Sequence, residues 1–125
     1  MTITHVQLIS LPVSDQSRAR DFYAGVLGFE VVHDLSIGPG ERWVQLRPPG
    51  AETSVTLVTW FADAMPAGAV RGLVLETDDL DGDVERLARR GVGFPDGVQQ
   101  EPWGRYATFA DPDGNRITLQ ATAVV

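Results

Sequence analysis

The carboxylate best placed for chemistry in this sequence is Glu76, which follows the apolar run Leu73, Val74 and Leu75. Side chains on a strand point alternately to its two faces, so Leu73 and Leu75 would pack on one face and Glu76 would lie on the other. A carboxylate among apolar side chains is desolvated, which raises its pKa toward the range suited to proton abstraction. Glu76 is therefore the candidate catalytic residue, as a general base. The alternative is a solvated carboxylate near a strand end.

A set of polar and aromatic side chains is predicted to lie on such faces of neighbouring strands, or in strands and loops near them. Ile117 and Leu119 in the last strand, and Val55 and Leu57 in the run 54–60, are the apolar positions expected to pack, which leaves the residues between them exposed to a ligand. An aromatic wall with a few polar anchors suits a flat or apolar molecule. The candidate ligand-binding residues are Thr56, Val58, Trp60, Trp43, Trp103, Arg105, Tyr106, Arg116, Thr118 and Gln120.

Several members of this set have a second interpretation. Trp43, Trp60 and Trp103 could each belong to the core or to a dimer interface instead of a ligand pocket. Arg105 and Arg116 could supply the positive partner of an anionic ligand or lie on the surface without a role. We keep both interpretations open at the level of sequence.

Two absent residue types exclude whole classes of reaction. The sequence has no cysteine, which excludes a thiolate nucleophile, a disulfide and cysteine metal ligands. All ten basic residues are arginine, so a lysine Schiff base and a lysine general base are also excluded. No nucleotide-binding or nucleophile-elbow motif is present. The two histidines, His5 and His33, are interpreted as surface residues at a strand start and on a strand edge.

Composition restricts the class of protein further. The chain has 125 residues, which is one domain's worth, small enough that a homodimer would help to stabilise it. A net charge of −7 repels phosphate backbones and anionic membranes, so we expect no nucleic-acid or membrane partner. Neither a long apolar run nor a signal-peptide pattern is seen, and a cytoplasmic location is expected.

The pattern of apolar residues and turns predicts a β-α-β-β-β order in each half of the chain. In the first half, the predicted strands are 3–13, 29–34, 42–46 and 54–60, and the helix begins after Ser14-Asp15 and ends at Gly28. In the second half, the predicted strands are 73–77, 92–94, 105–109 and 116–120, with a loop at 99–103 and a helix between Asp78-Asp79 and Gly91. Residues 62–70 are predicted to be a connector.

Landmarks of the two halves recur at a nearly constant offset, which indicates an internal duplication. Asp15 precedes Asp79 by 64 residues, and Gly28 precedes Gly91 by 63. We therefore expect one domain over 1–125, made of a module at about 3–61, a connector at about 62–70 and a second module at about 71–122.

The ordered set of motifs resembles the vicinal oxygen chelate superfamily, which includes glyoxalases, bleomycin-resistance proteins and extradiol dioxygenases. The motifs are Val13-Ser14-Asp15, Phe22-Tyr23, Leu27-Gly28-Phe29, Thr77-Asp78-Asp79-Leu80, Pro102-Trp103-Gly104 and Asp111-Pro112-Asp113-Gly114-Asn115. The resemblance covers essentially the whole chain. It implies an α+β fold in which two tandem β-α-β-β-β modules form a cup of curled sheets, often completed by dimerisation.

Metal-using members of this superfamily hold a divalent ion with His, Gln or Glu on the cup face. The resemblance places the corresponding positions at Leu8, Thr56, Gly72 (or Leu73, with a slip of one residue) and Thr118. Two neutral hydroxyls, a leucine and a glycine cannot hold a divalent ion, which needs about three N or O donors. We therefore predict no metal and no other cofactor at this place.

These observations favour a metal-free protein that sequesters an apolar or aromatic small molecule in its cup, with a homodimer as the expected assembly. A second hypothesis is an enzyme, namely a small-molecule lyase, isomerase or epimerase with Glu76 as general base, or a metal-dependent glyoxalase-like or dioxygenase-like enzyme with unusual ligands. A third is a regulatory module without ligand chemistry. The sequence leaves open whether the protein is an enzyme.

Overall fold

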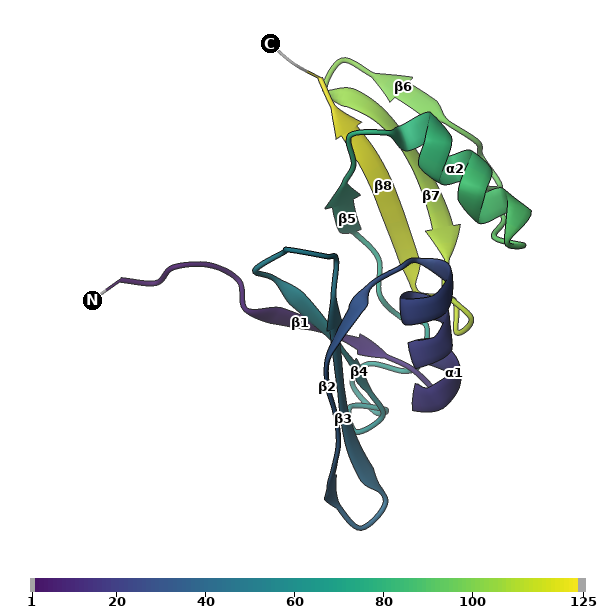
Figure 1. Ribbon diagram of the computed structural model, residues 1–125. Helices are drawn as coiled ribbons and strands as arrows, with labels where there is room; N and C mark the ends of the chain where they lie inside the picture. The colour runs from purple at the N-terminus through teal and green to yellow at the C-terminus, as the bar shows by residue number, and fades with distance from the viewer. Residues whose placement is uncertain (1, 124–125) are drawn as a thin grey trace.

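The computed structural model describes residues 2–123, which form two four-stranded sheets with the helices on one side (Figure 1). The first sheet contains β1 (Leu8–Pro12), β2 (Glu30–Gly38), β3 (Glu41–Arg47) and β4 (Ser54–Val58). The second contains β5 (Leu73–Glu76), β6 (Gln99–Glu101), β7 (Gly104–Ala110) and β8 (Arg116–Thr122). This is the expected mixed α+β architecture. None of the helices in the described part is long and apolar enough to cross a membrane.

Both sheets have the same strand order, which confirms the internal repeat. The order is β1-β4-β3-β2 in one sheet and β5-β8-β7-β6 in the other. The first and last strands of each module pair in parallel, Ser10 opposite Thr56 in the first sheet and Val74 opposite Thr118 in the second. The remaining pairs are antiparallel. Among residues 2–123, no strand pairs with the outer edge of β1 or of β5.

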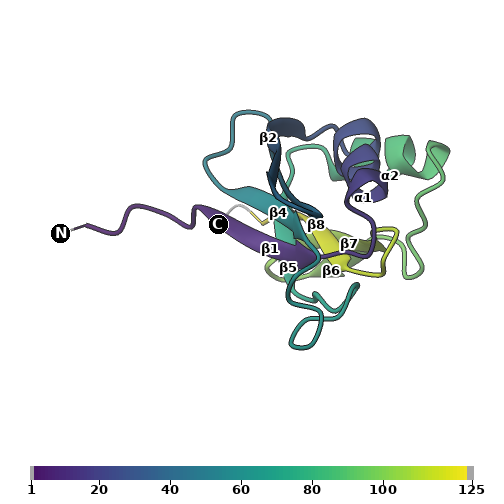
Figure 2. The same ribbon diagram turned by 90° about the horizontal axis from the view of Figure 1, so that it is seen from below.

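Each module has one helical segment that begins at an aspartate. Helix α1 (Gln16–Arg20) begins at Asp15, whose carboxylate accepts from the Arg18 amide at 3.0 Å, and continues as a π-helix, η1 (Asp21–Val26). Helix α2 (Leu80–Arg89) begins at Asp79, whose carboxylate accepts from the Gly82 amide at 3.1 Å. Such caps satisfy amide groups that have no partner within the helix. Figure 2 shows α1 and α2 on the same side of the sheets, so the other face of each sheet is not covered by a helix.

The core lies between the helices and the covered face of each sheet. Its buried side chains come from both modules and from both helical segments. They are Leu11, Val13, Ala19, Tyr23, Phe29, Val44, Leu46, Val55, Leu57, Leu80, Leu87, Ala107, Phe109, Ile117 and Leu119. The packed positions predicted in β4 and β8 are all in this set, because alternation along a strand separates a packed face from an open one.

The turn between β7 and β8 joins the two modules. Asp111 accepts from the Tyr23 hydroxyl at 2.8 Å and from the Asn115 side chain at 2.8 Å. The same Asn115 amide donates to the Pro12 carbonyl at the end of β1, at 2.9 Å. Close approach continues at Gly68 of the connector, where a Cβ would lie 2.0 Å from the Asp113 carbonyl oxygen. These contacts fix the first module against the second.

The predicted strands differ most from the structure in three places. Residues 3–7 are not part of β1, since β1 has a strand partner only from Leu8, opposite Ser54. The run 92–94 is not a strand. The second strand of module 2 along the chain is instead β6, Gln99–Glu101, within the region predicted to be a loop. Polar residues at 99–101 gave no alternating signal, and pairing with β7 alone makes them a strand.

Candidate functional site

The uncovered face of the first sheet combines two tryptophans with buried polar groups. Strand register places Gln45 of β3 beside Thr56 of β4, and Thr56 beside Ser10 of β1. The Ser10 and Thr56 hydroxyls are 3.0 Å apart and form a hydrogen bond. Trp43 lies on the same face as Gln45, and its ring stacks on Trp60 with centroids 6.2 Å apart and planes 17° apart. Trp60 is 37% exposed, so one aromatic surface remains available.

Gln45 was not among the predicted residues, although alternation could have found it. Its neighbours Val44 and Leu46 belong to the core, which places Gln45 and Trp43 together on the opposite face. The Trp43 indole donates to Gln45 Oε1 at 3.0 Å. Gln45 is only 7% exposed, so this is a polar group built into the sheet and not a solvated surface amide.

The uncovered face of the second sheet is more polar. Thr118 of β8 lies opposite Thr108 of β7, and their hydroxyls are 2.8 Å apart. Gln120 lies opposite Tyr106 on the same face. Arg116 is exposed at the start of β8 and Val74 is 49% exposed on β5. The predicted positions Tyr106, Arg116, Thr118 and Gln120 thus share one face, as alternation requires.

Glu76 lies on this face, but its environment is opposite to the expected one. It is exposed, and its two oxygens accept from the Thr122 hydroxyl at 2.5 Å and the Thr122 amide at 3.1 Å. The hydroxyl bond and then the amide bond lower the pKa of Glu76, against a smaller effect of desolvation. The expected rise in pKa was therefore wrong. A solvated carboxylate with donors around it is a weak base at neutral pH.

Two other predicted residues lie away from these open faces, and a third, Val58, shares the face of Thr56 but is buried. Arg105 lies on the same face of β7 as the buried Ala107 and Phe109, which is the helix side. Its guanidinium pairs there with Asp81 of α2 at 2.8 Å. Trp103 is 57% exposed in the turn between β6 and β7. Val58 is 1% exposed and so offers little surface to a ligand. Arg105 is therefore corrected from a ligand contact to a contact between strand and helix.

The positions that hold metal in the superfamily do not form a donor set here. Leu8 and Leu73 are aliphatic, Gly72 has no side chain, and the Thr56 and Thr118 hydroxyls are each hydrogen-bonded to another hydroxyl. Within residues 2–123, no three His, Asp or Glu side chains cluster closely enough to bind an ion. His5 and His33 are both exposed. The residues present do not fit a divalent cation.

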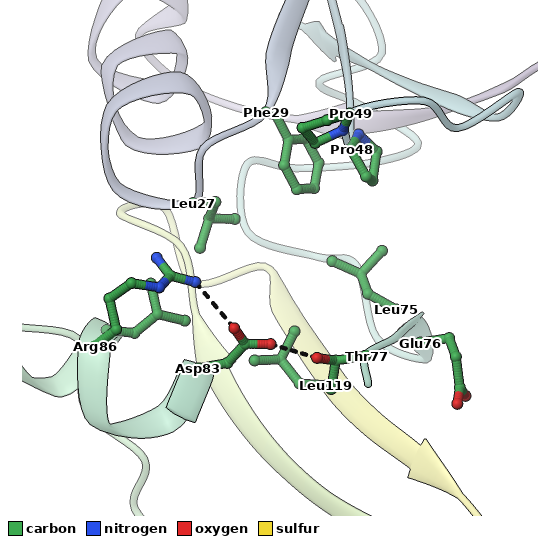
Figure 3. A pocket seen from close by; sticks show the side chains of 11 residues that line it. Leu27, Phe29, Pro48, Pro49, Leu75, Glu76, Thr77, Asp83, Arg86 and Leu119 are labelled. Atoms are coloured by element: carbon green, nitrogen blue, oxygen red, sulfur yellow. Dashed lines mark hydrogen bonds and ion pairs between the residues drawn. The ribbon is translucent and has the colours of Figure 1, made fainter. Parts of the chain in front are cut away.

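A further cleft lies away from these faces, between the two modules on the side of the helices (Figure 3). It has a volume of about 200 Å³. Apolar side chains from both modules line it, and a hydrogen-bonded trio of Thr77, Asp83 and Arg86 lies at one side. In Figure 3 the Glu76 carboxylate points away from this trio. Apart from Glu76, the predicted residues are not part of this cleft.

Over the open faces, the structure of a single chain has separate hollows. One of about 220 Å³ includes Tyr106 and Thr108 of β7. Another, of about 680 Å³ and largely apolar, lies between β1 and the connector and includes Ile9 and Phe61. Tyr106 is the one predicted residue that lines either of these two hollows, so the predicted residues of the two sheets do not share one of them.

Comparison with known proteins gives a consistent result. A model of the Glyoxalase/Bleomycin resistance protein/Dioxygenase superfamily matches residues 2–119. The chain is 31% identical over 121 residues to the uncharacterized protein YetH of Bacillus subtilis (strain 168), covering 94% of this chain and 98% of YetH.

Solved structures agree with this match. The structure of TnmS3, described as an antibiotic binding protein from Streptomyces sp. CB03234, superposes with a TM-score of 0.92 at 51% identity and covers 98% of this chain and 99% of TnmS3. A superfamily member from Sphaerobacter thermophilus DSM 20745 superposes with a TM-score of 0.88 at 40% identity, covering 95% of this chain and 98% of that one.

Proposed function

The chain belongs to the glyoxalase/bleomycin resistance protein/dioxygenase superfamily, and we propose that within it the protein binds and sequesters a flat, largely apolar small molecule of the antibiotic type, without a metal ion. The observation that carries this proposal is the Trp43–Trp60 stack beside the buried Gln45 amide. Stacked indoles provide a large apolar surface with little loss of side-chain entropy, which suits a polycyclic ligand. The similarity to an antibiotic binding protein supports the same class of ligand.

Sequestration needs shape and polarity, and it needs neither a base nor a cation. The open faces supply hydroxyls, amides and aromatic rings. Their one acidic candidate, Glu76, has a lowered pKa, and the superfamily's metal positions carry no His, Glu or Gln. Both observations favour binding over turnover.

We further propose that the working unit is a homodimer. In the described part of the chain, the outer edges of β1 and β5 have no strand partner, and unpaired edges with apolar side chains favour association. Pairing of β1 in one copy with β5 in the other would set the aromatic face of one sheet beside the polar face of a second. A shared cup would then contain Trp43 and Trp60 from one chain and Tyr106 and Thr118 from its partner.

One experiment distinguishes binding of the ligand without change from its enzymatic conversion. Tryptophan emission is followed during titration with a panel of planar aromatic antibiotics, and the bound compound is then extracted and identified by mass spectrometry. We expect quenching with recovery of the unaltered compound, also in protein treated with chelator. Recovery of a modified compound would support the enzyme alternative, and stoichiometric Zn, Ni, Fe or Mn in untagged protein would contradict the metal-free assignment.

The second candidate function is a lyase, isomerase or epimerase that uses Glu76. The position of Glu76 on an open face favours it, and the Thr122 hydrogen bonds disfavour it. For either function we propose a cytoplasmic location, which fractionation of cells followed by immunoblotting would test.

A further inference from the structure

The orientation of the Gln45 amide is fixed by its contact with Trp43. An indole N–H can only donate a hydrogen bond, so the atom 3.0 Å from Trp43 Nε1 must be the amide oxygen. The other end of the amide is therefore the NH2 group, which can only donate. This assignment does not depend on the choice between amide rotamers, because the reversed amide would place two donors against each other.

The NH2 group has no hydrogen-bond partner among residues 2–123, although the Gln45 residue is only 7% exposed. Its Nε2 is not one of the two polar atoms that are both sealed from solvent and unpaired, which are Arg20 Nε and Asp113 Oδ2. The donor therefore reaches the open face. A donor that has no protein partner and reaches an open face is available to an acceptor from solvent or from a bound ligand.

The charges near Gln45 favour a neutral acceptor. Arg47 is two residues further along β3, on the same face, and its guanidinium is paired with Glu30 at 2.5 Å. The whole chain carries a net charge of −7, which disfavours an anionic ligand. A carbonyl oxygen conjugated to an aromatic ring lies in the plane of that ring. It could therefore accept from Gln45 while the ring stacks on the neighbouring indoles.

We propose that Gln45 selects flat aromatic ligands that carry a neutral carbonyl oxygen at the ring edge, by donating to that oxygen, and that Trp43 is the positioning residue that turns the amide toward the ligand. This inference rests on the proposed binding function and adds the class of ligand. It assigns the role to a residue that contributes neither a metal ligand nor a base.

The test uses two three-ring probes that differ only in one carbonyl, 9-fluorenone and fluorene, with free and bound probe measured by equilibrium dialysis. We expect the wild-type protein to bind fluorenone about three- to tenfold more tightly than fluorene, the contribution of one neutral hydrogen bond. Gln45→Glu keeps an acceptor for Trp43 and loses the donor. Gln45→Met keeps the volume and loses both groups. Both variants should lose the preference for fluorenone while still binding fluorene.

A third variant tests the positioning role. Trp43→Phe keeps an aromatic ring but removes the indole N–H that holds the amide, so the ratio of fluorenone affinity to fluorene affinity should decrease, while the smaller ring should weaken the binding of both probes. An unchanged preference in this variant would remove the role of Trp43. Equal binding of the two probes to wild type, or an unchanged preference in both Gln45 variants, would overturn the role of Gln45 and leave the binding function intact. Failure of wild type to bind either probe would contradict the binding function itself.

Discussion

The Tyr23 hydroxyl donates a 2.8 Å hydrogen bond to Asp111 Oδ2, across 88 residues of sequence and between the two modules. Both groups are buried, Tyr23 at 0% and Asp111 at 5% exposure. Asp111 is also the acceptor for the Asn115 amide groups that shape the β7–β8 turn. One carboxylate thus organises the turn and attaches it to the first module.

Removal of this hydroxyl should destabilise the protein. In Tyr23→Phe, Asp111 keeps its Asn115 donors but loses one partner in a buried position, and we expect a loss of about 1–3 kcal/mol in the free energy of unfolding. Urea denaturation followed by fluorescence measures it. Tyr106→Phe is the matched control, because no side-chain hydrogen bond holds Tyr106 among the described residues, and it should change stability by less than about 0.5 kcal/mol.

Alkaline pH should act on the same contact. Burial raises the pKa of Tyr23, and the neighbouring Asp111 carboxylate raises it further. The phenol therefore stays neutral in the folded protein but ionises in the unfolded chain above about pH 10, so its contribution to stability is present below that pH and is lost above it. The difference in stability between wild type and Tyr23→Phe should narrow between pH 9 and 11. A constant difference in urea titrations across this range would contradict the shift.

Glu76 should be acidic and dispensable. The Thr122 hydroxyl, followed by the Thr122 amide, lowers its pKa, so NMR titration should give a midpoint below the ordinary value of about 4.3. Thr122→Val removes the hydroxyl and should raise that midpoint. Glu76→Gln should leave ligand binding unchanged. A variant with abolished turnover of some substrate would instead support the enzyme alternative.

Trp60 should carry much of the binding energy. It offers its ring to solvent while Trp43 stacks behind it. Trp60→Ala should weaken binding of a planar aromatic antibiotic by about tenfold or more, as is typical of an aromatic anchor, and Trp60→Phe should weaken it less. Isothermal titration calorimetry distinguishes the two variants. Equal affinities of wild type and Trp60→Ala would place the ligand elsewhere.

The free edge of β5 should control assembly. Val74 is 49% exposed on this strand, so Val74→Asp would place a charge in the proposed dimer contact. We expect wild type to sediment as a dimer and Val74→Asp to shift toward monomer. Val98→Asp changes a similarly exposed valine near β6, on the opposite edge of the sheet, and should remain dimeric. A monomeric wild type at all concentrations would contradict the dimer.

The repeated order of elements along the two halves and the packed faces of β4 and β8 could be predicted because they depend on local alternation and on turn residues, whereas the arrangement of the sheets was implied by the family resemblance. Alternation also places two further residues, Arg105 and Gln45. Ala107 and Phe109 are apolar, so Arg105 had to share their packed face, and Val44 and Leu46 similarly place Gln45 on the open one.

Other features depend on contacts between distant residues and leave no local signal. The strand at 99–101 exists because β7 pairs with it, and residues 3–7 lack such a partner. The pKa of Glu76 depends on Thr122, 46 residues away in sequence, which supplies two donors that the composition of the β5 strand does not reveal. Alternation along β5 predicted the face of Glu76 correctly, but the predicted rise in the pKa of Glu76 was wrong.

The contact between Tyr23 and Asp111 also means that one module cannot replace the other without loss of a buried hydrogen bond. At the duplicated offset of 63, the position equivalent to Tyr23 is Arg86 and the position equivalent to Asp111 is Pro48. Neither pair member has a counterpart in the other module. A chimera built from two first modules would bury a phenol with no acceptor, and one built from two second modules would bury a carboxylate with no phenol. The contact therefore couples the two modules, because neither module supplies both of its groups.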